Sequence, residues 1–142
     1  MVLAAAFVTW QDSRSGTSCD IYGQHISATG APLWTTNGYS FCSATNDQQF
    51  PKMAPDGAGG GIVAWMDVRG ATGHDIYAQR VSAAGATPWT TNGVPIRQAS
   101  FDQLNPVIVS DGAGSAITAW VDLRDGGTNI DAGRITAGGV LP

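Results

Sequence analysis

The sequence predicts an all-β protein that is built from copies of one antiparallel sheet unit. The pattern Trp-x-Asp-x-Arg begins at Trp10, Trp65 and Trp120, so successive copies are 55 residues apart. The 142 residues contain 19 glycines, no glutamate and a single lysine, Lys52, a composition that disfavours long surface helices. Self-similarity at this period is typical of a unit that buries its faces by stacking on its own copies.

Three further segments recur at the same period. Asp-Ile-Tyr begins at Asp20 and Asp75, Trp-Thr-Thr-Asn-Gly begins at Trp34 and Trp89, and Asp-Gly-Ala-Gly recurs in the second and third copies. The chain therefore divides into two repeat units and one incomplete unit, over residues 1–55, 56–110 and 111–142.

Each strand of the unit follows from its local sequence. Residues 103–110 are rich in β-branched side chains and end at an Asp-Gly turn signal. Residues 116–122 are apolar at alternating positions on both faces, as in a strand buried between layers. The Asp-Ile-Tyr strand follows and is degenerate at 129–135. A turn at 82–85 then leads into a fourth strand, which we place from Trp89 to Ile96.

Four short antiparallel strands per repeat, joined by glycine-rich turns, favour the blade of a β-propeller. A β-sandwich is the alternative, although a sandwich does not require internal repeats. When the repeats are aligned, the first blade begins at its second strand and the third blade ends before its fourth strand. We therefore expect ten strands, about 2.5 blades, in a single partial propeller over residues 1–142. Since a ring needs roughly four to eight blades, either the chain is part of a longer protein or several copies complete the ring.

The repeated motifs resemble a known family. Trp-x-Asp-x-Arg, Asp-Ile-Tyr and Ser-x-x-Gly-x-x-x-Trp together resemble the blades of sialidase-type propellers with Asp-box repeats, and the repeat arrays of secreted bacterial proteins. The aspartate after which the Asp box is named is absent from the corresponding residues 27–30 and 82–85. The resemblance implies an extracellular or cell-surface protein, with the Trp-x-Asp strand second from the centre of the ring.

Charge and composition exclude several partners. The net charge of −4 disfavours nucleic acid and anionic membranes, and no apolar run approaches the roughly 20 residues of a membrane span. Residues 1–7 look superficially like a signal segment but lack its basic start, so we interpret them as part of a strand. We expect no cofactor and no metal: two cysteines are too few for a zinc framework, and residues 122–127 do not match a calcium loop.

The most prominent polar groups are three repeated carboxylate–guanidinium pairs. Residues two apart on a strand share a face, so the two side chains of each pair can meet. Repetition in every unit favours a structural role over a ring of ligand-binding groups. The pairs are Asp12 with Arg14, Asp67 with Arg69, and Asp122 with Arg124.

The sequence argues against catalysis. By resemblance, sialidase chemistry uses a tyrosine activated by a glutamate, and this chain has no glutamate. Hydrolysis by two aspartates would be conceivable, but most aspartates recur with the repeat, as structural residues do. His25 and His74 are not equivalent and have no nucleophile motif beside them, so a triad is unsupported.

We therefore predict a non-enzymatic extracellular module that assembles with itself and acts in recognition or as a scaffold. The alternatives are a carbohydrate-binding lectin and a sialidase-like hydrolase fragment. Trp34 and Trp89 could stack on sugar rings or fill the gap between blades. A ligand would bind loops between the second and third strands and between blades, with candidate residues Asp47, Gln48, Arg69, His74, Asp102 and Gln103.

Two cysteines, Cys19 and Cys42, occur in the first repeat alone. If a hairpin turns at Gly30-Ala31, pairing Ser27 with Trp34, the same register places the two cysteines opposite each other. They would then form either a disulfide or a pair of free buried thiols, and both outcomes remain open.

Overall fold

A computed structural model describes residues 5–142, and every regular element among them is a β-strand. No helix that could cross a membrane occurs within this part of the chain. The interpretation of residues 1–7 as strand falls partly on residues 1–4, which lie outside the described range. The strands are β1 (Ala6–Asp12), β2 (Asp20–Ile26), β3 (Tyr39–Cys42), β4 (Gln48–Pro55), β5 (Gly61–Asp67), β6 (Asp75–Val81), β7 (Val94–Arg97), β8 (Gln103–Ser110), β9 (Ala116–Asp122) and β10 (Asn129–Ile135).

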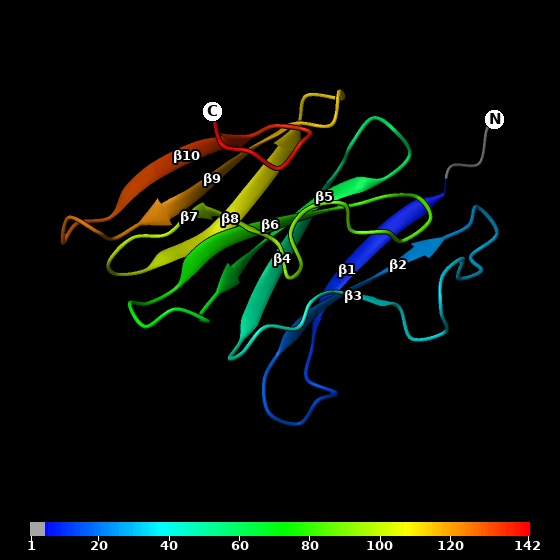
Figure 1. The fold of residues 1–142 in the computed structure, drawn as a ribbon, viewed down its shortest axis with the longest axis horizontal. Helices are drawn as coiled ribbons and strands as arrows, with labels where there is room; N and C mark the ends of the chain where they lie inside the picture. Colours follow the sequence, from blue (N-terminus) through cyan, green and yellow to red (C-terminus); the bar gives the residue numbers. More distant parts are fainter. Residues whose placement is uncertain (1–4) are drawn as a thin grey trace.

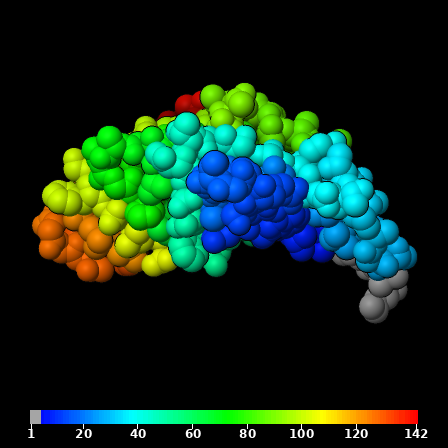
Figure 2. All heavy atoms as spheres, turned by 90° about the horizontal axis from the view of Figure 1, so that it is seen from below, coloured from blue at the N-terminus to red at the C-terminus, as the bar shows by residue number. Residues whose placement is uncertain are grey.

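The strands form three antiparallel sheets. The first sheet has the order β1-β2-β3, the second β4-β5-β6-β7 and the third β10-β9-β8. The sheets follow one another in chain order, with the four-stranded sheet between the two three-stranded ones (Figure 1). The predicted all-β fold with ten strands is confirmed. Seen from below, the described part of the molecule is arched (Figure 2).

The repeated residues occupy equivalent places in the three sheets. Trp10 pairs with Tyr22 and Trp65 pairs with Tyr77, whereas Trp120 pairs with Asp131 in the third sheet. The register also shifts at matching points of the first strands, between Gln49 and Lys52 in β4 and between Leu104 and Val107 in β8. The internal repeat is thus a repeat of backbone geometry as well as of sequence.

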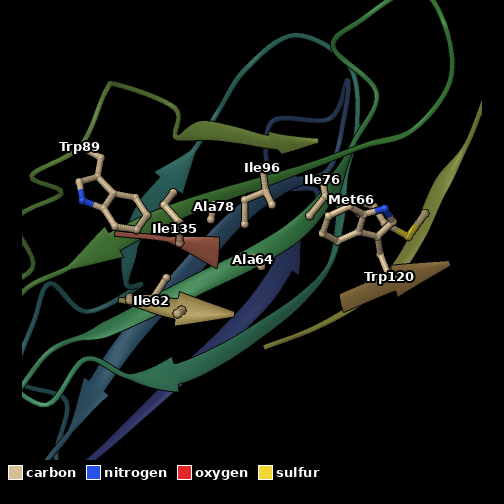
Figure 3. Close-up of a cluster of buried hydrophobic side chains, with 10 residues drawn as sticks. Ile62, Ala64, Met66, Ile76, Ala78, Trp89, Ile96, Trp120 and Ile135 are labelled. Carbon is tan, nitrogen blue, oxygen red and sulfur yellow. The ribbon is translucent and has the colours of Figure 1, made fainter. Parts of the chain in front are cut away.

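Two hydrophobic clusters lie where successive sheets meet. One contains Ile21 and Phe41 of the first sheet with Val63 and Trp65 of the second. The other joins the second and third sheets, with Trp89 and Trp120 at opposite ends of the buried group in Figure 3. All seven residues of β5 are buried, because the second sheet is covered on both faces.

The fourth strand of the unit begins later than the sequence predicted. Trp-Thr-Thr-Asn-Gly at 89–93 is a turn, in which the backbone N–H of Gly93 donates to the carbonyl of Thr90 at 2.8 Å. Asn92 and Gly93 both have positive φ, 65° and 85°, and two such residues in succession break the regular extended backbone. The strand therefore starts at Val94, and the equivalent strand of the first sheet starts at Tyr39.

The predicted cysteine register is wrong. Cys42 pairs with Ile21, and the register between β2 and β3 shifts at Ile21 and Tyr22, so Cys19 does not lie opposite Cys42. The hairpin is also closed differently, through the backbone N–H of Ser27 donating to Ala31 at 2.8 Å. Cys42 is buried, Cys19 is half-buried, and both are free thiols.

Candidate functional site: the sheet junctions and the open sheet faces

The Trp-x-Asp-x-Arg motif is built around a buried carboxylate. Asp67 ends β5 and has no exposed surface. Its Oδ2 accepts a hydrogen bond from the indole Nε1 of Trp65 at 2.8 Å, and its Oδ1 accepts from Nε and the backbone N–H of Arg69 at 2.8 and 2.9 Å. Several donors thus compensate the cost of burying the charge.

Arg69 also connects two sheets. Its guanidinium lies 3.9 Å from the ring centroid of Tyr77, and Nη2 donates to the carbonyl of Asn92 at 2.9 Å. The same nitrogen lies 3.1 Å from the Sγ of Cys42, which belongs to the first sheet. Burial raises the pKa of the Cys42 thiol to about 11, so at neutral pH this contact involves the protonated thiol.

The other two copies of the motif keep the carboxylate, and the third copy replaces the aromatic partner. Arg14 pairs with Asp12 and lies 4.0 Å from the ring centroid of Tyr22, and its hydrogen bond to Asp12 holds the pKa of that carboxyl below its usual range. In the third sheet Arg124 pairs with Asp122 at 3.1 Å and also with Asp131, which replaces the tyrosine. The arginine therefore keeps a partner across the hairpin in all three sheets.

The aspartates that precede β4 and β8 connect each sheet to the one before it. Oδ1 of Asp47 accepts from the backbone N–H of Cys19 at 2.7 Å. Oδ1 of Asp102 accepts from the backbone N–H of His74 at 2.9 Å and lies 2.9 Å from its Nδ1. These bonds to His74 lower the pKa of the Asp102 carboxyl.

The glutamines beside these aspartates are fully buried. The backbone N–H of Gln48 donates to Cys19 at 2.7 Å, and that of Gln103 donates to His74 at 2.8 Å. Asp47, Gln48 and Arg69 thus lie at the first junction, and His74, Asp102 and Gln103 lie at the second. The Asp-Gln pairs are equivalent, but Arg69 and His74 are not. The carboxylate and backbone hydrogen bonds of these residues join one sheet to the next, which favours a role in joining sheets, while the side-chain oxygens of Gln48 and Gln103 are buried without a partner among the described residues.

The two outer tryptophans also connect sheets. The indole Nε1 of Trp34 donates to the carbonyl of Ala83 at 2.9 Å, and that of Trp89 donates to the carbonyl of Ala137 at 3.0 Å. Each acceptor lies in the turn of the next sheet. Both indole rings therefore contact the next sheet, which agrees with the interpretation that they fill the gap between blades.

Sequence reasoning missed the partners of these tryptophans. The Ala83 carbonyl also lies 3.2 Å from Nδ1 of His25, and the Ala137 carbonyl accepts from Arg80 at 3.4 Å. His25 and Arg80 are 55 residues apart, so their equivalent positions in the repeat could have indicated that they share this role. One carbonyl in each following turn therefore receives two side-chain contacts from the sheet before it.

The third sheet leaves an apolar face that no described residue covers. Ile117 is 49% exposed and Ile130 is 74% exposed, and Val107 and Val109 lie on the same face. The residue equivalent to Ile117 in the second sheet is Ile62, which has no exposed surface because it packs on the third sheet. The opposite end of the array has a similar opening, where Val8 is 44% exposed although its equivalent Val63 is fully buried.

Comparison with protein-family models and with curated proteins finds no match to this chain. Within residues 5–142, no group of three or more His, Cys, Asp or Glu side chains is placed to hold a metal ion. The open faces of the first and third sheets are the candidate for function, because Val8 and Ile117 are exposed there although their equivalents Val63 and Ile62 are buried.

Proposed function

We propose that this chain is a partial β-propeller whose sheets are blades, and whose two open faces bind further copies of the same chain. It acts as an extracellular scaffold or recognition module and not as an enzyme. The supporting observation is the difference between Ile62 and Ile117, equivalent residues of which one is fully buried and the other is 49% exposed. Exposed apolar sheet faces of this kind mark interaction surfaces.

The expected occupant of the open third sheet is the first sheet of another copy. The two junctions within the chain share one arrangement of apolar contacts, and the residues equivalent to Ile62 and Val63 on the two open faces would form the apolar part of a third junction between copies. The face of the third sheet that carries Ile117 corresponds to the covered face of the second sheet. The face of the first sheet that carries Val8 corresponds to the face of the second sheet that carries Val63 and packs against the first sheet. Head-to-tail contact of this kind closes a ring or continues as a filament.

The experiment is absolute mass by light scattering at micromolar concentration, for the unchanged chain and for three variants. Ile117→Lys places a charge on the open third sheet, and Val8→Lys does so on the open first sheet. Val107→Lys is the matched control, because the equivalent residue of the second sheet is Lys52, which is exposed beside an intact junction. We expect an oligomer from the unchanged chain and from the Val107→Lys variant, and a monomer from the other two.

Three results would contradict the proposal. A monodisperse monomer of 14.6 kDa for the unchanged chain would show that copies do not cover these faces. Loss of assembly with Ile117→Lys but not with Val8→Lys would show a symmetric contact between third sheets. Hydrolysis of a fluorogenic sialoside by the purified chain would contradict the non-enzymatic role.

A further inference from the structure

A pocket of about 480 Å³ opens at one end of the first sheet. Its walls are residues 15–18, which connect β1 to β2, and residues 43–46, which connect β3 to β4. Five of these residues carry hydroxyl groups. Those of Thr17, Ser18, Ser43 and Thr45 make no hydrogen bond to any described residue, so they are available to a ligand.

A buried carboxylate also faces this pocket. Asp20 begins β2, lines the pocket and is 6% exposed, and its carboxyl group accepts no hydrogen bond from residues 5–142. Burial raises its pKa, and the nearby charges of Asp12 and Asp47 raise it further. The described lining contains no lysine, arginine or histidine. The Asp20 oxygens are not among the fully buried atoms that lack a partner, so they are accessible from the pocket and free to accept hydrogen bonds from a ligand.

The equivalent carboxylate of the second sheet has its partners within the chain. Asp75 accepts a hydrogen bond from the backbone N–H of Ala99 at 3.3 Å. Burial raises the pKa of Asp75, and the nearby Gln98 amide, which donates to the Tyr77 hydroxyl at 2.7 Å, partly offsets that rise. Ser43 occupies the place of Gln98 in the first sheet, and its side chain is too short to take that role. The unpartnered carboxylate is thus specific to the first sheet.

We infer that this pocket binds a small hydroxylated organic cation, with a primary ammonium group on the Asp20 carboxylate and hydroxyl groups among the serine and threonine side chains. An ammonium group has three donors and no acceptor, which complements a carboxylate that lacks donors. An uncharged polyol would leave the negative charge without a counterion. A bare divalent cation prefers six to eight oxygen ligands, often from several carboxylates, whereas a single carboxylate lines this pocket.

The test is a titration of the full chain with glucosamine, followed through backbone amide chemical shifts near pH 6.5, below the pKa of about 8 of such amines. Glucose is the uncharged comparison with nearly the same shape. Two variants probe the site: Asp20→Asn removes the charge, and Ser43→Gln restores the side chain that the second sheet has, with Asp20 intact. Asp75→Asn is the matched control in the second sheet, and melting temperatures verify that each variant is folded.

We expect glucosamine to shift the amides of residues 15–18 and 43–46 in a saturable way, and glucose to shift none of them. Asp20→Asn and Ser43→Gln should each weaken binding at least tenfold, and Asp75→Asn should leave it unchanged. Equal binding of glucose and glucosamine would overturn the assignment of a cation. No saturable shift with glucosamine, or saturation by calcium chloride at lower concentration, would also overturn the proposal.

Discussion

At the scale of single residues, two phenylalanines occupy backbone conformations that favour glycine or asparagine. Phe50 has a φ of 54° and Phe101 a φ of 64°, and both side chains are at least half exposed. The equivalent residues in the other repeat are Asn105 and Asn46, with φ values of 53° and 63°. The repeated feature is therefore the left-handed backbone, which asparagine tolerates at lower cost than phenylalanine does.

Replacing Phe101 by asparagine should stabilise the protein. The exposed ring loses little buried surface, and relief of the left-handed strain is worth about 1 kcal/mol in the free energy of unfolding. Denaturant unfolding monitored by tryptophan fluorescence measures the change. The reverse substitution in the first repeat, Asn46→Phe, should cost a similar amount. A loss of stability in Phe101→Asn would mean that the ring contributes more than the strain costs.

The two cysteines should differ in reactivity. Cys42 is buried with its pKa raised to about 11, while Cys19, just before the central strand β2, is half-buried. We expect a thiol reagent at about pH 8 to modify one cysteine per folded chain and two after unfolding. In Cys19→Ser, the folded protein should not react. Rapid modification of two thiols in the folded chain would contradict the burial of Cys42.

The raised pKa of Cys42 also sets a pH dependence for stability. The folded state holds the thiol proton more tightly than the unfolded chain does. The free energy of unfolding is thus unaffected below pH 9.0, the ordinary value, and decreases as the pH rises towards about 11. Replacement of Cys42 by alanine should remove this part of the alkaline decrease.

At the scale of elements, the sequence indicated the strands better than it indicated the turns. Strands at 103–110 and 116–122 have the predicted bounds because their apolar patterns are continuous, and the degenerate strand at 129–135 has them because it could be aligned with the Asp-Ile-Tyr strands of the other repeats. The fourth strand was placed too early because Trp89 and two threonines favour strands, whereas the positive φ of Asn92 decides the local conformation.

Contacts between elements were harder to predict than the strands. The repeat identified the carboxylate–guanidinium pairs, but it could not show that Arg69 reaches Cys42 in another sheet. The cysteine register failed because a shift within the β2–β3 pair cannot be seen in the spacing of residues. The pocket at Asp20 depends on a single difference between repeats, Ser43 against Gln98, whose effect appears only in three dimensions.

The pair of Asp67 and Arg69 should be important for stability because it lies at a sheet junction. Asp67→Ala removes the acceptor of Trp65 and leaves the partly buried guanidinium without its carboxylate, at a cost of about 3 kcal/mol. Asp12→Ala should cost less, since its arginine is exposed. Thermal unfolding compares the two variants. Equal melting temperatures for Asp67→Ala and the unchanged chain would refute the structural role.

At the scale of the whole molecule, successive sheets are joined by a shared set of hydrogen bonds at both junctions. The tryptophan of one sheet donates to the turn of the next at both junctions, and an aspartate of the later sheet binds back to the earlier one. The turns also touch, since a side chain at Gly57 would collide with the Gly112 carbonyl. Stacking by repeated nearest-neighbour contacts is typical of arrays whose stability is a sum over units and junctions.

Equivalent junctions make the length of this protein adjustable by gene duplication. A second copy of residues 56–110, inserted after residue 110, would present the same surfaces to its neighbours on both sides. We expect the lengthened chain to fold with one more four-stranded sheet and to unfold at a higher temperature, because one junction is added for each unit. Crossover between repeats of the gene could therefore lengthen or shorten the array without the selection of a new interface at each step.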